Sequence, residues 1–87
     1  MTKNLQEIEA KIEEINTTIS NRIKTIGHHA EIYKELGWLV GLGMAKAWLS
    51  IGQAGEIAMQ IYFKSTIAKS PHEQGIKEAL EFCLEGD

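Results

Sequence analysis

Two histidines and two glutamates lie between His28 and Glu35, and they are the residues of this chain whose types and spacing best suit a metal ion. His28, Glu31 and Glu35 fall on one face of a helix. Carboxylate-bundle sites use the order Glu-x-x-His and zinc peptidases use His-Glu-x-x-His, and neither order occurs here. Three ligands from one helix leave a metal short of partners unless symmetry repeats them. We therefore expect a solvated polar face and no metal site.

Arg22 and His29 interrupt a regular apolar pattern, where a polar or charged side chain is costly unless it is paired. We expect Glu56 or Gln60, further along the chain, to reach one of them. The favoured interpretation is a polar pair that fixes the register of two helices. The alternative is a pocket for a small anionic ligand at a helix or subunit interface, with the guanidinium of Arg22 as its anchor.

Catalysis has little support in the sequence. No Ser-His-acid arrangement is legible around the serines, and Gly41-Leu42-Gly43 lacks the third glycine and the preceding strand of a phosphate-binding loop. Cys83 is the only cysteine, so no intramolecular disulfide can form. Its neighbours Phe82 and Leu84 predict a buried thiol in a reducing, cytoplasmic compartment. We expect no enzyme activity and no cofactor.

Most of these side chains belong to a segment in which apolar residues recur at alternating spacings of three and four residues. The positions of this pattern are Leu5, Ile8, Ile12, Ile15, Ile19, Arg22, Ile26, His29, Tyr33 and Leu36. The pattern predicts a coiled-coil-like helix over about 4–36. Asn4 and Glu7 are spaced for a capping box at its start, and Gly37 suits the left-handed residue after its end. A break at Gly27, or a helix that continues past Gly37, is the alternative.

The second segment, about 38–68, predicts a helix that is apolar nearly all round and must be covered on several sides. Small residues at which another helix can approach closely are Gly41, Ala45, Gly52 and Gly55. A third helix is expected over about 71–85. There Ser70 is the N-cap, Pro71 takes the first helical position and Glu73 closes a capping box.

The expected helix lengths decide the predicted assembly. Two helices of about 45–50 Å do not fit a compact domain of this size, whose radius of gyration is about 12 Å. We therefore predict a single all-α domain over 1–87, a long helical hairpin with a short third helix, which assembles into a homo-oligomeric bundle with coiled-coil-like packing. The expected interface residues are Ile12, Ile15, Ile19, Ile26, Tyr33, Trp38 and Trp48.

The charge and hydropathy of the chain argue against two classes of partner, nucleic acids and membranes. The net charge is −3, no basic stripe is present, and residues 71–87 carry one lysine against five acids, so we expect no nucleic-acid partner. The apolar run from Leu36 to Ile51 contains Lys46 and is shorter than the ~20 residues that cross a bilayer, so we do not expect a membrane partner. The expected function is a small soluble protein that binds another macromolecule, as an inhibitor, adaptor or assembly factor. The alternatives are the small-ligand binder above and a membrane-active, holin-like helical hairpin.

Overall fold

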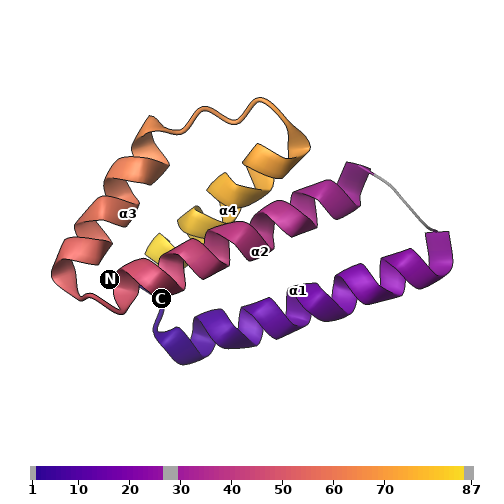
Figure 1. Ribbon diagram of the computed structural model, residues 1–87, viewed down its shortest axis with the longest axis horizontal. Helices are drawn as coiled ribbons and strands as arrows, with labels where there is room; N and C mark the ends of the chain where they lie inside the picture. Colours follow the sequence, from indigo (N-terminus) through magenta and orange to yellow (C-terminus); the bar gives the residue numbers. More distant parts are fainter. Residues whose placement is uncertain (1, 27–29, 86–87) are drawn as a thin grey trace.

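The computed structural model describes residues 2–26 and 30–85, without the side chains of residues 25, 26, 30 and 31. The described residues form four helices and no strand. The helices are α1 (Leu5–Ile26), α2 (Ala30–Leu49), α3 (Gln53–Ser65) and α4 (Pro71–Glu85) (Figure 1). The all-α prediction is confirmed. The predicted hairpin of two long helices with a short third one is wrong, since each long segment is divided into two helices.

The first predicted helix begins as expected. The backbone N–H of Glu7 donates to Asn4 Oδ1 at 2.8 Å, and the N–H of Asn4 donates to Glu7 Oε1 at 3.1 Å, which completes the capping box. The helix ends at Ile26, well before Gly37, and α2 starts at Ala30 and runs back beside α1 (Figure 1). A single helix over 4–36 is therefore wrong.

Gly37 lies inside α2, so its predicted role as a helix end is also wrong. A Cβ atom on Gly37 would overlap the carbonyl of His72, and one on Gly75 would overlap the carbonyl of Lys34. One turn on, a Cβ on Gly41 would lie 2.8 Å from the Cβ of Ala79. These residues let the backbones of α2 and α4 touch, which confirms the expectation that another helix approaches closely at Gly41.

The predicted helix over 38–68 breaks after Leu49. Gly52 has a φ of 84°, a left-handed conformation that side chains other than that of glycine rarely adopt. A Cβ atom on Gly55 would overlap the carbonyl of Trp48, so the glycine allows α3 to fold back against the end of α2. The polar residues Lys46, Ser50, Gln53 and Glu56 keep spacings of four and three across the break at 50–52. The pattern therefore predicted one helix.

The third predicted helix is confirmed as α4. The N–H of Glu73 donates to Ser70 Oγ at 3.2 Å, as an N-cap requires. The carboxylate of Glu73 reaches one residue further than predicted and accepts the N–H of Lys69 at 2.9 Å.

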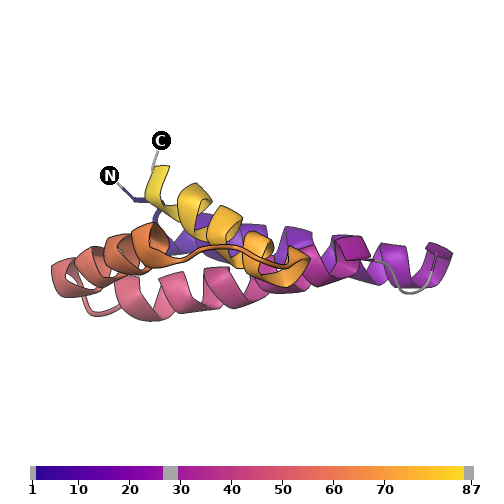
Figure 2. The ribbon, with the colours of Figure 1, turned by 90° about the horizontal axis from the view of Figure 1, so that it is seen from above.

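The helix α2 occupies the centre of the fold, with α1 along one side and α4 behind it (Figures 1 and 2). The largest fully buried side chains are Ile8, Leu42, Met59, Leu80 and Cys83. The molecule measures 41 × 28 × 19 Å with a radius of gyration of 13.0 Å. The two long segments, each divided into two helices, therefore pack compactly in one copy. The length argument for oligomerisation therefore does not hold. None of the helices formed by the described residues is long and apolar enough to cross a membrane.

Candidate interaction surface

One face of α2 is exposed along its length and contains only apolar residues. Among the α2 residues whose side chains are described, the exposed ones are Tyr33, Leu36, Val40, Gly43 and Ala47, which we call the α2 stripe. The exposed fractions of its three large side chains are 52%, 38% and 43%, in chain order. Their spacing of three and four residues places them in one row on the helix surface.

The charged side chains of α2 lie at its edges, where they pair with neighbouring helices. Lys34 Nζ lies 3.1 Å from Glu78 Oε2 on α4, and Lys46 Nζ lies 3.1 Å from Glu9 Oε2 on α1. Glu35 pairs with Arg22 of α1. These ion pairs draw the charged groups toward α1 and α4, to the edges of the α2 stripe, where the side chains of Lys34 and Lys46 are 41% and 40% exposed.

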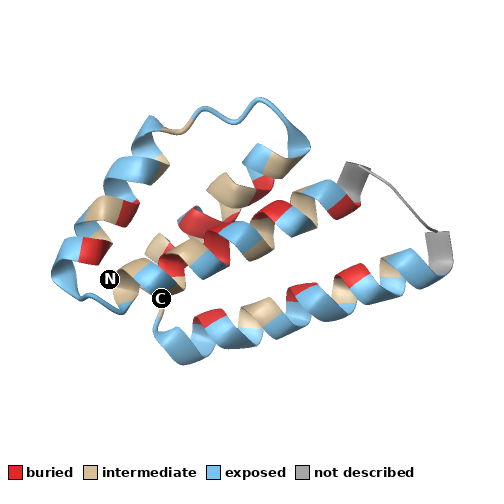
Figure 3. Cartoon of the chain, viewed as in Figure 1, coloured by how far each residue is buried: buried red, intermediate tan, exposed pale blue. Residues whose placement is uncertain are grey.

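No other helix crosses this face. In Figure 1 α4 lies behind α2 and α1 lies below it, and in Figure 2 the side of α2 away from α4 is open. Figure 3 shows the same side, with exposed positions recurring along α2 between buried and intermediate ones. The α2 stripe is therefore accessible to a second molecule.

A second apolar surface lies on α3. Ile57 and Ile61, which we call the α3 outer face, are 52% and 63% exposed on the side away from the core. Gly55 and Met59 are the buried residues of α3. Figure 3 shows the buried positions of α3 on its inner side. The rings of Trp48 and Tyr62, whose centroids lie 5.5 Å apart, hold α3 against the end of α2.

The residues predicted to form a polar site are not brought together. Arg22 pairs with Glu35 across α1 and α2, not with Glu56 or Gln60. Those two residues belong to α3, which lies at the opposite end of the molecule from the C-terminal end of α1, near which Arg22 lies (Figure 1). His29, the other polar residue of the predicted site, lies outside the described residues. A polar pair between neighbouring helices does form at Arg22, with a carboxylate that the sequence analysis had considered only as a metal ligand.

Arg22 lines a cleft of about 300 Å³ in which two cations and two carboxylates meet. Its lining residues are Ile15, Arg22, Lys34, Glu35, Trp38 and Glu78, which come from α1, α2 and α4. The indole N–H of Trp38 donates to Glu78 Oε1 at 3.2 Å, in addition to the ion pair between that carboxylate and Lys34. The formal charges in this cleft balance, so an anion entering it must compete with Glu35 for Arg22.

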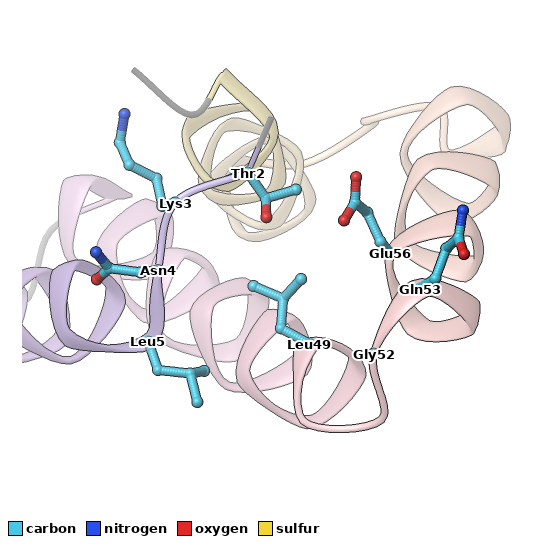
Figure 4. A pocket seen from close by; sticks show the side chains of 8 residues that line it. All are labelled: Thr2, Lys3, Asn4, Leu5, Leu49, Gly52, Gln53 and Glu56. Atoms are coloured by element: carbon cyan, nitrogen blue, oxygen red, sulfur yellow. The ribbon is translucent and has the colours of Figure 1, made fainter.

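Glu56 points into a larger, open cleft of about 530 Å³ between the N-terminal segment and the start of α3 (Figure 4). Thr2, Asn4 and Leu49 also line this cleft, which lies at the N-terminal end of α3. The cap residue Gly52 offers no side-chain hydrogen bond there. The carboxylate of Glu56 already supplies the negative charge that a helix N-terminus favours, so the geometry does not single out an anion site.

The predicted interface residues divide into buried and exposed ones. Ile15 and Ile19 are 8% and 9% exposed and belong to the core of one copy. Ile12, Trp38 and Trp48 are partly buried against that core, whereas the side chain of Ile26 lies outside the described part of the structure. Tyr33 is the member of the predicted set that lies on the α2 stripe.

Cys83 is fully buried, as its apolar neighbours predicted. Burial raises the pKa of its thiol to about 11, partly offset by the positive charge of Lys3. A protonated and inaccessible thiol is a poor nucleophile. Among the described residues, no three His, Cys, Asp or Glu side chains are grouped so that they could hold a metal ion.

Comparisons with protein-family models, with curated proteins and with solved structures found no match for this chain. The α2 stripe was not predicted from the sequence, although its spacing carries a signal. Val40, Gly43 and Ala47 continue the spacing of three and four residues that Tyr33 and Leu36 carry on from the first helix.

Proposed function

We propose that this chain is an interaction protein, which binds another protein through exposed apolar helix faces and has no catalytic activity of its own. The observation that supports this proposal is the ordered exposure of large apolar side chains on α2 and α3. Single exposed apolar residues are ordinary on protein surfaces, whereas contiguous apolar faces commonly mark interaction sites.

The α3 outer face is the surface that we assign to a different protein. Ile57 and Ile61 are one helical turn apart and are more than half exposed. Gln53 and Gln60 are exposed beside them, and the exposed Lys64 follows Ile61 in the same row. This arrangement suits a partner with an apolar groove that receives two anchors from one helix. An inhibitor, an adaptor and an assembly factor all use such a contact.

The test compares the protein partners that variants of the tagged protein capture from cells of its source. Ile57→Lys with Ile61→Lys should abolish capture of a partner that the wild type retains, because both anchors become charged. Gln6→Lys with Asn16→Lys is the matched control, since it adds the same charge at exposed positions of α1, outside the α3 outer face. Circular dichroism checks that both variants remain helical. If no captured protein distinguishes the isoleucine variant from the control, the proposal is wrong.

A second candidate function is the binding of a small anionic ligand in the cleft beside Arg22. The observation in its favour is the convergence of charged side chains from three helices and the ring of Trp38 on one cleft. Native mass spectrometry of the purified protein is the test. A retained mass of a small molecule that Arg22→Ala removes, with unchanged helicity, supports this function. Recovery of the bare chain mass from the wild type counts against it.

A further inference from the structure

Gly43 is a glycine for which the fold of a single copy gives no reason. It lies inside α2 without a positive φ, and a Cβ atom built on it meets nothing within 4 Å. By contrast, Gly37 and Gly41 of the same helix face the backbone of α4 and leave no room for a side chain. A glycine inside a helix lowers its stability relative to alanine, so a close approach from outside the chain is the physical reason that remains.

The α2 stripe is complementary to itself when two copies run antiparallel. Its large residues Tyr33, Leu36 and Val40 precede its small residues Gly43 and Ala47, with the exposed Ser50 next on the pattern. In an antiparallel pair, the two core positions of the heptad face each other across the interface. Leu36 of one copy then faces Ala47 of the other, Val40 faces Gly43, and Tyr33 faces Ser50. Every layer places a large side chain against a small one.

A parallel pair lacks this match. Each residue would face its own copy, so that Tyr33 meets Tyr33 and Leu36 meets Leu36 at one end. At the other end, Gly43 would face Gly43 and leave a gap. Since well-packed interfaces need complementary shapes, the order of side chains along the stripe favours the antiparallel arrangement.

We propose that the α2 stripe binds a second copy of this chain, forming an antiparallel two-fold dimer. The two-fold axis crosses the stripe at the height along α2 that lies midway between Gly41 and Leu42. A two-fold contact uses the same patch on both copies, as this stripe requires. The stripe runs about 21 Å along α2. With the partly buried Leu39 and Met44 on its flanks, and with its large side chains between 38% and 52% exposed, it offers on the order of 400 Å² of surface per copy. The total of about 800 Å² is below the size of stable interfaces, so the dimer is weak.

An uncharged surface also selects this occupant over a charged one. The α2 stripe itself contains no charged residue. Lys34 and Lys46 at its edges have side chains that are 41% and 40% exposed, but they already pair with Glu78 and Glu9, so an acidic partner would have to displace those carboxylates. A copy of the same stripe offers only apolar surface in return. The inference rests on the proposed function, to which it adds that one apolar face serves self-association while the α3 outer face stays available to another protein.

Sedimentation equilibrium over a concentration series tests the dimer. Val40→Lys places two like charges within about one helical turn of each other across the two-fold axis, and should raise the dissociation constant at least about tenfold. Ile61→Lys is the matched control, because it puts the same charge at a comparably exposed position on α3 and should leave the dimer intact. If circular dichroism finds Val40→Lys unfolded, Ala47→Lys replaces it on the same stripe.

Cysteine cross-linking tests the orientation. Copies with Leu36→Cys mixed with copies with Ala47→Cys should form a disulfide with each other, because these positions face one another in the antiparallel pair. Ala47→Cys alone should not, since its two positions then lie about 16 Å apart along the axis, beyond disulfide reach. Cys83 is fully buried and stays out of the reaction, as the wild-type chain verifies.

Each other outcome overturns the inference. A wild type that is monomeric at every concentration removes the dimer, and so does a Val40→Lys variant that dimerises like the wild type. Self-cross-linking of Ala47→Cys rejects the antiparallel arrangement. A monomer whose stripe binds phospholipid vesicles identifies a different occupant. Loss of the dimer in Val40→Lys and loss of the captured partner in the α3 variant are separate readouts, so either proposal can fail while the other stands.

Discussion

The apolar face of α1 and the α2 stripe lie on one heptad register but have opposite environments. In α1 this register is core in the middle of the helix, where Ile8, Ile15 and Ile19 are 0%, 8% and 9% exposed, whereas Leu5 at the helix start is 43% exposed. In α2 the same register carries Tyr33, Leu36 and Val40, which are between 38% and 52% exposed. The residue that α2 buries at the start of this stretch is Ile32, one position out of register.

The difference follows from the reversal of the chain between the two helices. Once α2 turns back along α1, its contact with α1 and α4 is made by a different face. Small residues at Gly37 and Gly41 turn that face toward α4, and the pairs of Glu35 and Lys46 with α1 fix its other edge. The heptad register then points outward. A continuous apolar pattern therefore identifies a surface that contacts something, but not whether the contact lies within the chain.

The largest expected effect compares a core residue with a stripe residue. Ile8→Ala should lower the free energy of unfolding by about 2–5 kcal/mol, because it leaves a cavity among fully buried side chains. Val40→Ala should cost less than about 1 kcal/mol at concentrations where the chain is monomeric. Urea unfolding followed by circular dichroism measures both. Equal losses would mean that the stripe is covered within a single copy.

The second effect uses the buried thiol as a probe of the core. The pKa of Cys83 is raised from 9.0 to about 11 in the folded chain, so burial of the thiol stabilises the fold fully below pH 9. As the pH rises from about 9 to about 11, the unfolded chain loses the thiol proton first, and the fold should lose up to about 2–3 kcal/mol. Urea unfolding of wild type and of Cys83→Ala over this range isolates the contribution of the thiol. Parallel pH profiles for the two proteins would contradict the burial.

The third effect concerns the contact between α2 and α4. Gly37→Ala should destabilise the fold by about 1–3 kcal/mol, since the added methyl group overlaps the backbone of His72 and forces the helices apart. Thermal unfolding measures the loss. A variant as stable as the wild type would show that the close packing of α2 on α4 is wrong.

Much of the fold was predictable from local signals. The capping residues Asn4, Glu7 and Ser70 mark helix starts through hydrogen bonds within a single turn, and sequence spacing is enough to recognise them. The helix breaks were harder to find. Gly37 and Gly52 are the same residue type, yet one packs inside a helix and the other has a left-handed backbone at a helix start. Gly37 packs inside a helix because α4 lies against it, and this contact depends on the tertiary structure, which the local sequence does not show.

For the polar pair at Arg22 and for the α2 stripe, the sequence indicates the types of residue involved but not their neighbours in the fold. Sequence spacing predicted that Arg22 needs a carboxylate, but the partner depends on where the chain reverses, and Glu35 became its neighbour only once α1 ended at Ile26. The exposed face of α2 was predictable in its composition. Its orientation was not, because whether Val40 faces the core or solvent depends on the side of α2 that packs against α4.

The smallest expected effect is that of Gly43→Ala, and it separates a glycine that faces open space, Gly43, from one that packs against α4, Gly37. Gly43→Ala should raise the free energy of unfolding of the monomer by about 0.5–1 kcal/mol, because alanine is the better helix former and its methyl group enters open space. The same methyl group should weaken the proposed dimer, since it faces Val40 of the other copy. The opposite signs separate the two roles of the residue. Unfolding at low concentration measures the first effect, and sedimentation equilibrium at high concentration measures the second. Gly37→Ala is the control, because its cost should be independent of concentration if the dimer leaves the packing of α2 on α4 unchanged. A Gly43→Ala variant that stabilises the chain without weakening self-association would show that the stripe has a partner other than its own copy.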